Sequence, residues 1–271
     1  MPRDLTPTLL VATAQPQAPL VSAAAPREIL VLSWAAPFNW LHLGWQDLMA
    51  HPGTSLFYGL PFWCMALVLH GLFHTEPEYV MPLVSGCLLA GPFVAMGLHD
   101  MSRRREQGQA ADFMASLTCW KPHLRSLGLL VGLLVVLELM WGRVSLVMLA
   151  LFFDTGLPTS AGLIEAAVNV DNLDFVAAFV ASTSIFALLV FTVLVVSIPM
   201  VLDRETDALT AAIISAEVVS LNTGVMLLWG AMIVAMTILS LLLPLALGLL
   251  VAGPLLGHAS WHSYKASVRW P

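Results

Sequence analysis

The stretch LGLLVGLLVVLELMWGRVSLVMLALFF, residues 127–153, is apolar apart from Glu138, Arg143 and Ser145. A helix needs about 20 consecutive, predominantly apolar residues to cross the roughly 30 Å hydrocarbon core of a bilayer. The stretch is long enough for one crossing, and it lacks the strict alternation of outer-membrane strands. It therefore predicts a transmembrane helix.

The composition of the whole chain extends this prediction. Of the 271 residues, 59% are hydrophobic and 10% are charged, whereas about 25% of a soluble domain is charged. Further spans are predicted at residues 55–73, 79–99 and 175–202. The apolar run 224–260 is long enough for two passes, with a turn at Pro244. We expect an all-α membrane bundle of six transmembrane helices.

The basic residues predict how this bundle is oriented. Lysine and arginine are concentrated in cytoplasmic loops, and ten of the 11 here fall on one side of the six-span topology, with Arg143 the exception. Both termini are therefore expected in the cytoplasm. Residues 1–28, rich in Pro, Ala, Gln and Thr, are expected to be a disordered cytoplasmic tail ahead of the membrane domain, residues 29–271.

Three parts of the chain, about residues 38–105, 109–208 and 209–265, share an order of features. Each is expected to contain a short amphipathic helix at the membrane surface, then a helical hairpin, then a polar segment. Because each repeat holds two spans, successive repeats point the same way, which implies a pseudo-threefold axis along the membrane normal. A proline lies eight residues before a polar residue in each repeat: Pro92 before Asp100, Pro199 before Asp207, and Pro254 before His262.

The first surface helix is predicted from FNWLHLGWQDLM, residues 38–49. Its apolar side chains and one glycine recur at three- and four-residue spacing, and His42, Gln46 and Asp47 lie between them. Two interpretations are open. The helix lies among lipid headgroups, which suits its tryptophans, or it is a cap packed on the bundle.

Four motifs resemble one family of bacterial integral membrane proteins, domain of unknown function 2189. They are LGWQDLMAHPGTSLFYGL (43–60), LLAGPFVAMGLHDMSRR (88–104), SIPMVLDRETDALTA (197–211) and GPLLGHASWHSY (253–264). The resemblance runs from about Trp40 to Tyr264 and implies a six-span inner-membrane protein, but it supplies no activity. Some members carry a cytochrome c oxidase label. A haem-copper core needs histidines paired at matching depth, and none of the eight here are predicted to face each other near the midplane, so a catalytic oxidase subunit is excluded.

Glu138 is the first candidate for a functional residue. Counted from Leu127 at 1.5 Å per residue, it lies roughly 17 Å into its span, near the midplane, where a charge costs about 2.5–3.5 kcal/mol on insertion scales. Either it forms a protonated or hydrogen-bonded contact between helices, or it belongs to a solute or proton pathway. The same pathway would include Arg143, which is about 140° around the helix and poorly placed to pair with Glu138, and the helix breaks at Pro92 and Pro254.

A second candidate site, for a ligand or a proton, lies at the cytoplasmic ends of the second and sixth spans. If these spans are neighbours, two histidines one turn apart meet a third histidine and a carboxylate, a combination that suits a transition metal or proton exchange. The alternative is an interfacial belt in which Trp261, Tyr264 and Lys265 anchor the helix end among headgroups. The site residues are His99, Asp100, His258 and His262.

The sequence contains no phosphate loop, dinucleotide fingerprint or hydrolase elbow. We therefore expect a non-enzymatic protein that binds or transports a small solute or ion. The alternative is an accessory or assembly protein of a respiratory complex, with haem or metal contact through its histidines. The sequence requires no cofactor, indicates no nucleic-acid partner, and specifies neither the solute, the metal nor the oligomeric state. Anionic lipid is the expected contact of three consecutive basic residues: Arg103, Arg104 and Arg105.

Overall fold

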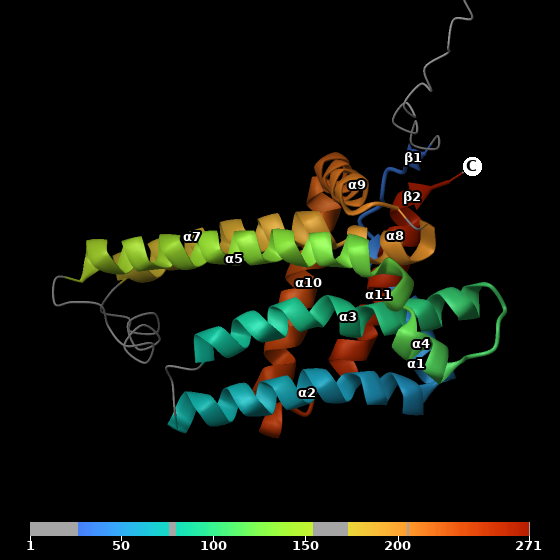
Figure 1. Ribbon diagram of the computed structural model, residues 1–271, viewed down its shortest axis with the longest axis horizontal. Coiled ribbons are helices and arrows are strands. Elements are labelled where there is room, and N and C mark those ends of the chain that lie inside the picture. The colour runs from blue at the N-terminus through green and yellow to red at the C-terminus, as the bar shows by residue number, and fades with distance from the viewer. Residues whose placement is uncertain (1–26, 76–79, 154–172, 205, 271) are drawn as a thin grey trace, which may run out of the picture.

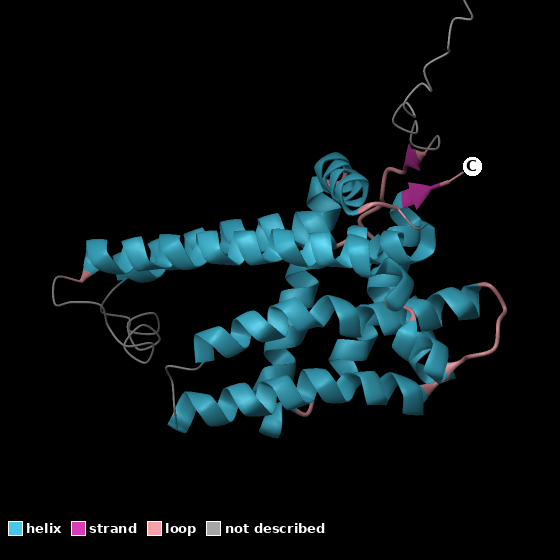
Figure 2. Ribbon diagram, in the orientation of Figure 1, coloured by secondary structure: helices cyan, strands magenta, loops and turns pink. Residues whose placement is uncertain are grey.

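The computed structural model describes residues 27–75, 80–153, 173–204 and 206–270, and helices dominate it (Figure 2). Nearly all of the predicted tail lies outside these residues. In chain order the elements are β1 (Glu28–Ile29), α1 (Ala36–Ala50), α2 (Pro52–Thr75), α3 (Val80–Glu106), α4 (Phe113–Thr118), η2 (Lys121–His123), α5 (Leu124–Phe152), α7 (Leu173–Leu194), α8 (Ser197–Arg204), α9 (Ala208–Leu221), α10 (Thr223–Leu242), η4 (Pro244–Ala246), α11 (Leu249–Ser267) and β2 (Val268–Arg269).

Within the residues that the structure describes, four helical stretches are long and apolar enough to cross a membrane. Their outer surfaces carry large apolar side chains such as Leu139 and Ile185, both more than half exposed, as lipid-facing helices require. α3 and α11, which correspond to the second and sixth predicted spans, are not among the four, so the six-span topology stays a prediction. The four stretches are Pro52–Leu72, Phe113–Phe152, Leu173–Arg204 and Thr223–Leu242.

The long helices form pairs, α2 with α3, α5 with α7, and α10 with α11. A short helix precedes each pair, namely α1, α4 and α9, in the order that the three predicted repeats require. In Figure 1, however, α2, α3, α5 and α7 run along the long axis of the molecule, whereas α10 and α11 run across it. The pseudo-threefold arrangement is therefore not confirmed.

Prolines shape two of the predicted spans. The turn expected at Pro244 is confirmed, because η4 separates α10 from α11 there and Leu245 has a φ of 53°. The fourth predicted span divides into α7 and α8, since Pro199 has no N–H with which to bond the carbonyl of residue 195. Ser215 of α9 supports this break, accepting from the N–H of Val196 at 3.3 Å and donating to the carbonyl of Thr192 at 2.6 Å.

Helix α1 is a cap packed across α11 rather than a helix lying among headgroups. Trp40 and Leu48 are each 1% exposed. Between them, a Cβ atom at Gly44 would lie 2.8 Å from the backbone nitrogen of Ala259, so only glycine lets the two helices approach this closely. Trp45, which is 45% exposed, lies on the opposite face.

The two ends of the described chain meet at one end of the molecule. β1 pairs antiparallel with β2, a small departure from the all-α expectation (Figure 1). Asn222, between α9 and α10, accepts from the N–H of Leu32 at 2.8 Å and donates to the carbonyl of Leu30 at 3.1 Å. Arg27 forms an ion pair with Glu217. Arg27 and the residue after it therefore belong to the folded part, not to the predicted tail.

Candidate functional site

The structure places the three histidines and the aspartate of the predicted site in three different environments. His258 and His262 belong to a buried network centred on Asp47. Asp100 pairs with arginines of its own helix. His99 lies on the wall of a cavity. The four candidates therefore do not form a single site.

The first environment is a hydrogen-bond network around a buried carboxylate on α1. Ser102 Oγ of α3 donates to Asp47 Oδ2 at 2.5 Å, and His262 Nε2 of α11 donates to the same oxygen at 2.8 Å. The guanidinium of Arg105 pairs with the other oxygen of Asp47. The Asp47 network, as we call it, consists of Asp47, Ser55, Ser102, Arg105, His258 and His262.

Hydrogen bonds in this network determine which nitrogen of His258 carries a proton. Because Ser102 donates its only proton to Asp47, His258 Nδ1 must donate to Ser102 Oγ across 2.8 Å. Nε2 then accepts from Ser55 Oγ at 3.0 Å. Both ring nitrogens are used within the protein, and His258 is 1% exposed. His258 is therefore a structural link between α2, α3 and α11 rather than an open ligand.

The protonation of Asp47 links the network to pH. Burial favours the neutral carboxyl, but hydrogen bonds from His262, Ser102 and Arg105 and the charge of His262 outweigh it, so the pKa of Asp47 lies below its usual value. A folded-state pKa below the unfolded one stabilises the fold above about pH 4, and this contribution is lost as the pH falls through the folded pKa. We expect thermal stability in detergent to drop in this acid range, and Asp47→Asn to show a smaller drop. An unchanged acid profile in the variant would contradict this account.

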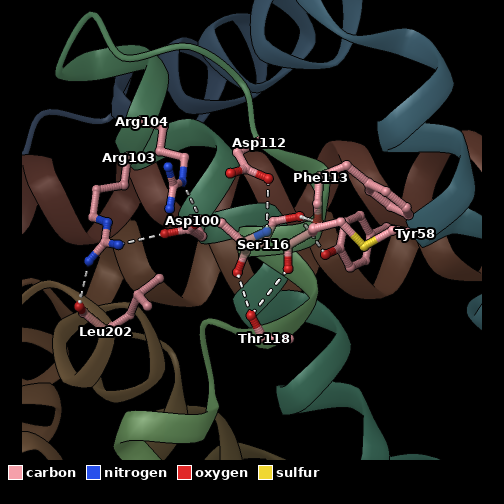
Figure 3. Close-up of polar contacts among 11 residues, drawn as sticks. Tyr58, Asp100, Arg103, Arg104, Asp112, Phe113, Ser116, Thr118 and Leu202 are labelled. Atoms are coloured by element: carbon pink, nitrogen blue, oxygen red, sulfur yellow. Dashed lines mark hydrogen bonds and ion pairs between the residues drawn. The ribbon is translucent and has the colours of Figure 1, made fainter.

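Asp100 lies in the second environment, near the end of α3. Its fully buried carboxylate accepts from Arg103 at 2.5 Å and from Arg104 at 2.7 Å. Arg103 also donates to the carbonyl oxygen of Leu202 in α8 at 2.8 Å, and so joins two elements (Figure 3). The next arginine along the chain pairs within the Asp47 network. Each of the three consecutive arginines thus has a carboxylate partner inside the protein.

The interfacial-belt interpretation of the α11 end is wrong. Trp261 and Tyr264 are fully buried. The Trp261 indole donates to Glu106 at 3.0 Å, and the Tyr264 hydroxyl donates to Asp203 at 2.8 Å. Lys265 also lies 3.6 Å from Glu106. Since α1, α2, α3 and α8 surround α11, its polar end meets carboxylates of neighbouring helices instead of lipid headgroups.

The third environment, that of His99, is a cavity of about 580 Å³ among α3, α5, α7, α8, α10 and α11. This volume lies in the range of small-molecule sites, which are typically apolar with a few placed polar groups. Its lining is largely aliphatic and aromatic. The lining residues with polar or ionisable side chains are His99, Glu138, Trp141, Thr183 and Ser260.

Glu138 is half-buried on this cavity wall. On α5 it shares the cavity-facing side with Leu134, Leu137 and Trp141, at the spacing of one helix face. Its carboxylate makes no hydrogen bond or ion pair with any residue in the described parts of the chain. Arg143 is exposed and borders a different surface groove. As expected from the helix geometry, the two do not pair.

The remaining pathway candidates differ in their position. The breaks expected at Pro92 and Pro254 are not seen, because α3 continues as a helix through Pro92 and α11 continues through Pro254. Gly91, next to the first of these prolines, lines the cavity. Pro254 is buried in α11 but is not among the lining residues. His99 is 2% exposed, and its Nδ1 atom has no hydrogen-bond partner in the parts of the chain that are described.

Sequence reasoning missed one residue of the buried network and two residues of the cavity wall. Asp47 lies seven residues after Trp40 and is 5% exposed, so it shares the buried face of α1 rather than the polar one. The spacing alone contained this signal. Trp141 and Thr183 were also missed: the Trp141 indole donates to Thr183 Oγ1 at 3.2 Å and links α5 to α7 at the cavity wall. Only Trp141 had a sequence signal, its position three residues after Glu138.

The helices that supply most of the cavity lining are also the part recognised by comparison. Residues 80–203 match a family model described as a predicted integral membrane protein. The family is DUF2189. The DUF2189 match begins with α3 and ends in α8, so it is narrower than the resemblance seen in the motifs. No curated protein and no solved structure matches the chain. The DUF2189 match supports an integral membrane protein and assigns no activity.

Proposed function

We propose that this protein binds, and in doing so carries or senses, a small apolar molecule within the membrane. The observation that supports the proposal is the cavity of about 580 Å³ with Glu138 on its apolar wall. A carboxylate in the middle of a span normally faces a partner, a water-filled space or a substrate pathway. No described residue is that partner. A bound molecule would fill the apolar part of the cavity beside Glu138.

The proposal describes a binding protein or transporter rather than an enzyme. The polar groups that resemble catalytic machinery, in the Asp47 network, are occupied by one another. We further propose that the end carrying β1, β2 and the three arginines faces the cytoplasm, on the basis of the basic residues. The family resemblance supports a bacterial inner membrane. At that end Arg105, whose side chain is 41% exposed, is available to anionic lipid as well.

A role as an accessory protein of a respiratory complex stays a prediction. Its sequence support came from histidines, and His258 and His262 are held within the Asp47 network. In the part of the chain that the structure describes, no three His, Cys, Asp or Glu side chains form a group suited to a metal ion. An absorbance spectrum and elemental analysis of the purified protein test this alternative, which predicts a Soret band or a bound metal.

Filling the cavity tests the proposed function. Ala187 of α7 lines the cavity, whereas Ala181, also exposed on α7, does not. We expect Ala187→Phe to weaken saturable binding of radiolabelled 1,1,1-triphenylethane, a neutral apolar probe, at least fivefold, because the new ring occupies the space. Ala181→Phe is expected to bind like the wild type. Binding is measured by equilibrium dialysis in an uncharged detergent, with protein-free micelles as the blank.

The outcome depends on the comparison between the two phenylalanine variants. Equal binding by Ala187→Phe and Ala181→Phe would place the bound probe outside the cavity and contradict the proposal. An absence of saturable binding to the wild-type protein would contradict it as well.

A further inference from the structure

The geometry points to a lipophilic organic cation as the molecule that the cavity takes, an inference that rests on the proposed function. It combines three features of the cavity: the sign of its charge, its aromatic lining and its apolar remainder.

The charge on the cavity wall favours a cation. Glu138 and His99 are the ionisable residues among the lining residues, which include no lysine or arginine. Arg143, the basic residue nearest in sequence on α5, borders another groove. A neutral ligand would leave the carboxylate unpaired, and an anion would be repelled by it in surroundings of low polarity. A cation would pair with it.

His99 does not oppose this assignment. It is 2% exposed, and its Nδ1 atom has no hydrogen-bond partner in the described chain. Charging an imidazole that is buried this deeply, with no carboxylate bonded to it in the described chain, is unfavourable. The neutral ring leaves Glu138 as the group that sets the sign of the charge in the cavity.

Aromatic side chains provide a second attraction for a cation. Trp141, Phe186 and Phe191 all line the cavity. Trp141 follows Glu138 by three residues on the same helix face, and its bond to Thr183 holds the indole at the wall. Aromatic faces attract cations, and tryptophan does so most strongly, particularly where water is excluded.

The rest of the lining favours a lipophilic cation over a hydrated metal ion. The walls supplied by α3, α7 and α8 are largely aliphatic, and the described chain offers no group of three metal-ligating side chains. Such a wall cannot replace the hydration shell of an inorganic ion, but it can bury the apolar groups that surround an organic cation.

Two probes of the same shape test this inference. Methyltriphenylphosphonium carries a positive charge, and 1,1,1-triphenylethane is its neutral carbon counterpart. We expect the wild-type protein to bind the phosphonium at least tenfold more tightly, after correction for partition into protein-free micelles. Glu138→Gln should lose this preference while it retains binding of triphenylethane, which also shows that the variant is folded. Arg143→Gln, on another face of α5, is the matched control and should retain the preference.

The two probes separate failure of this inference from failure of the proposed function. If the wild-type protein binds both probes equally, or Glu138→Gln keeps the preference for the phosphonium, the ligand class is wrong and the cavity remains a site for neutral molecules. If neither probe binds saturably to the wild-type protein, the proposed function fails and the inference fails with it.

Discussion

Replacing Gly59 with alanine is expected to be among the most damaging small substitutions in this protein. A Cβ atom at this position of α2 would lie well under 3.0 Å from the carbonyl oxygen of Leu250, close to the start of α11. A backbone oxygen cannot rotate away as a side chain can, so the two helices must separate. Overpacking typically costs about 1–3 kcal/mol and sometimes more, and we expect a loss of about 3 kcal/mol here.

Gly71 provides the matched control on the same helix. A Cβ atom there meets nothing within 4 Å, so Gly71→Ala should be neutral or should stabilise the helix by up to about 1 kcal/mol. The measurement is thermal unfolding of both variants in the same detergent. Equal effects of the two substitutions would show that the crossing of α2 and α11 at Gly59 is not as close as the structure has it.

Asp47→Ala is expected to have the other large effect. The substitution leaves Ser102 and His262 without their acceptor and removes the partner of Arg105. Removing one member of a buried charged pair costs about 3–5 kcal/mol. Because the side chain of Arg105 is 41% exposed, water compensates part of this loss, and we expect about 3 kcal/mol. The loss should appear as a lower unfolding temperature in detergent.

Asp112→Ala is the control, because it removes an aspartate at an exposed position. Asp112 caps α4 by accepting from the N–H of Ala115 at 3.0 Å, at an exposed position. Loss of such a cap costs about 1 kcal/mol, so the Asp47 variant should be clearly the less stable of the two. If Asp47→Ala unfolds at the same temperature as Asp112→Ala, the network does not hold the α1 cap on the bundle.

Several features of the fold could be predicted because they depend on neighbours along the chain. The apolar stretch from Leu127 predicted α5 to within a few residues. Pro244 predicted the turn before α11, and helix geometry predicted that Arg143 does not pair with Glu138. These inferences use local hydrophobicity, the missing N–H of proline and the angle between residues on one helix. The motifs also indicated the family whose model matches residues 80–203.

Other features depend on which helices meet. Trp261 and Tyr264 look like interfacial anchors in sequence, but α11 is surrounded by other helices, so both are buried. His99 and His258 are both expected in the site at the cytoplasmic ends of two spans, yet one faces a cavity and the other a hydrogen-bond network. Residue type and depth do not determine the direction in which a helix presents its side chains.

By itself, the sequence therefore determined an integral membrane protein of apolar helices, with an acidic residue in the middle of one of them. Only the tertiary structure decided that Glu138 lies on a cavity wall with no partner among the described residues, and that Asp47 lies at the centre of a buried network. The physical reason is that hydrophobicity and helix periodicity are local properties. A cavity or a buried ion pair arises instead from contacts between residues far apart in the chain, such as Asp47 and His262.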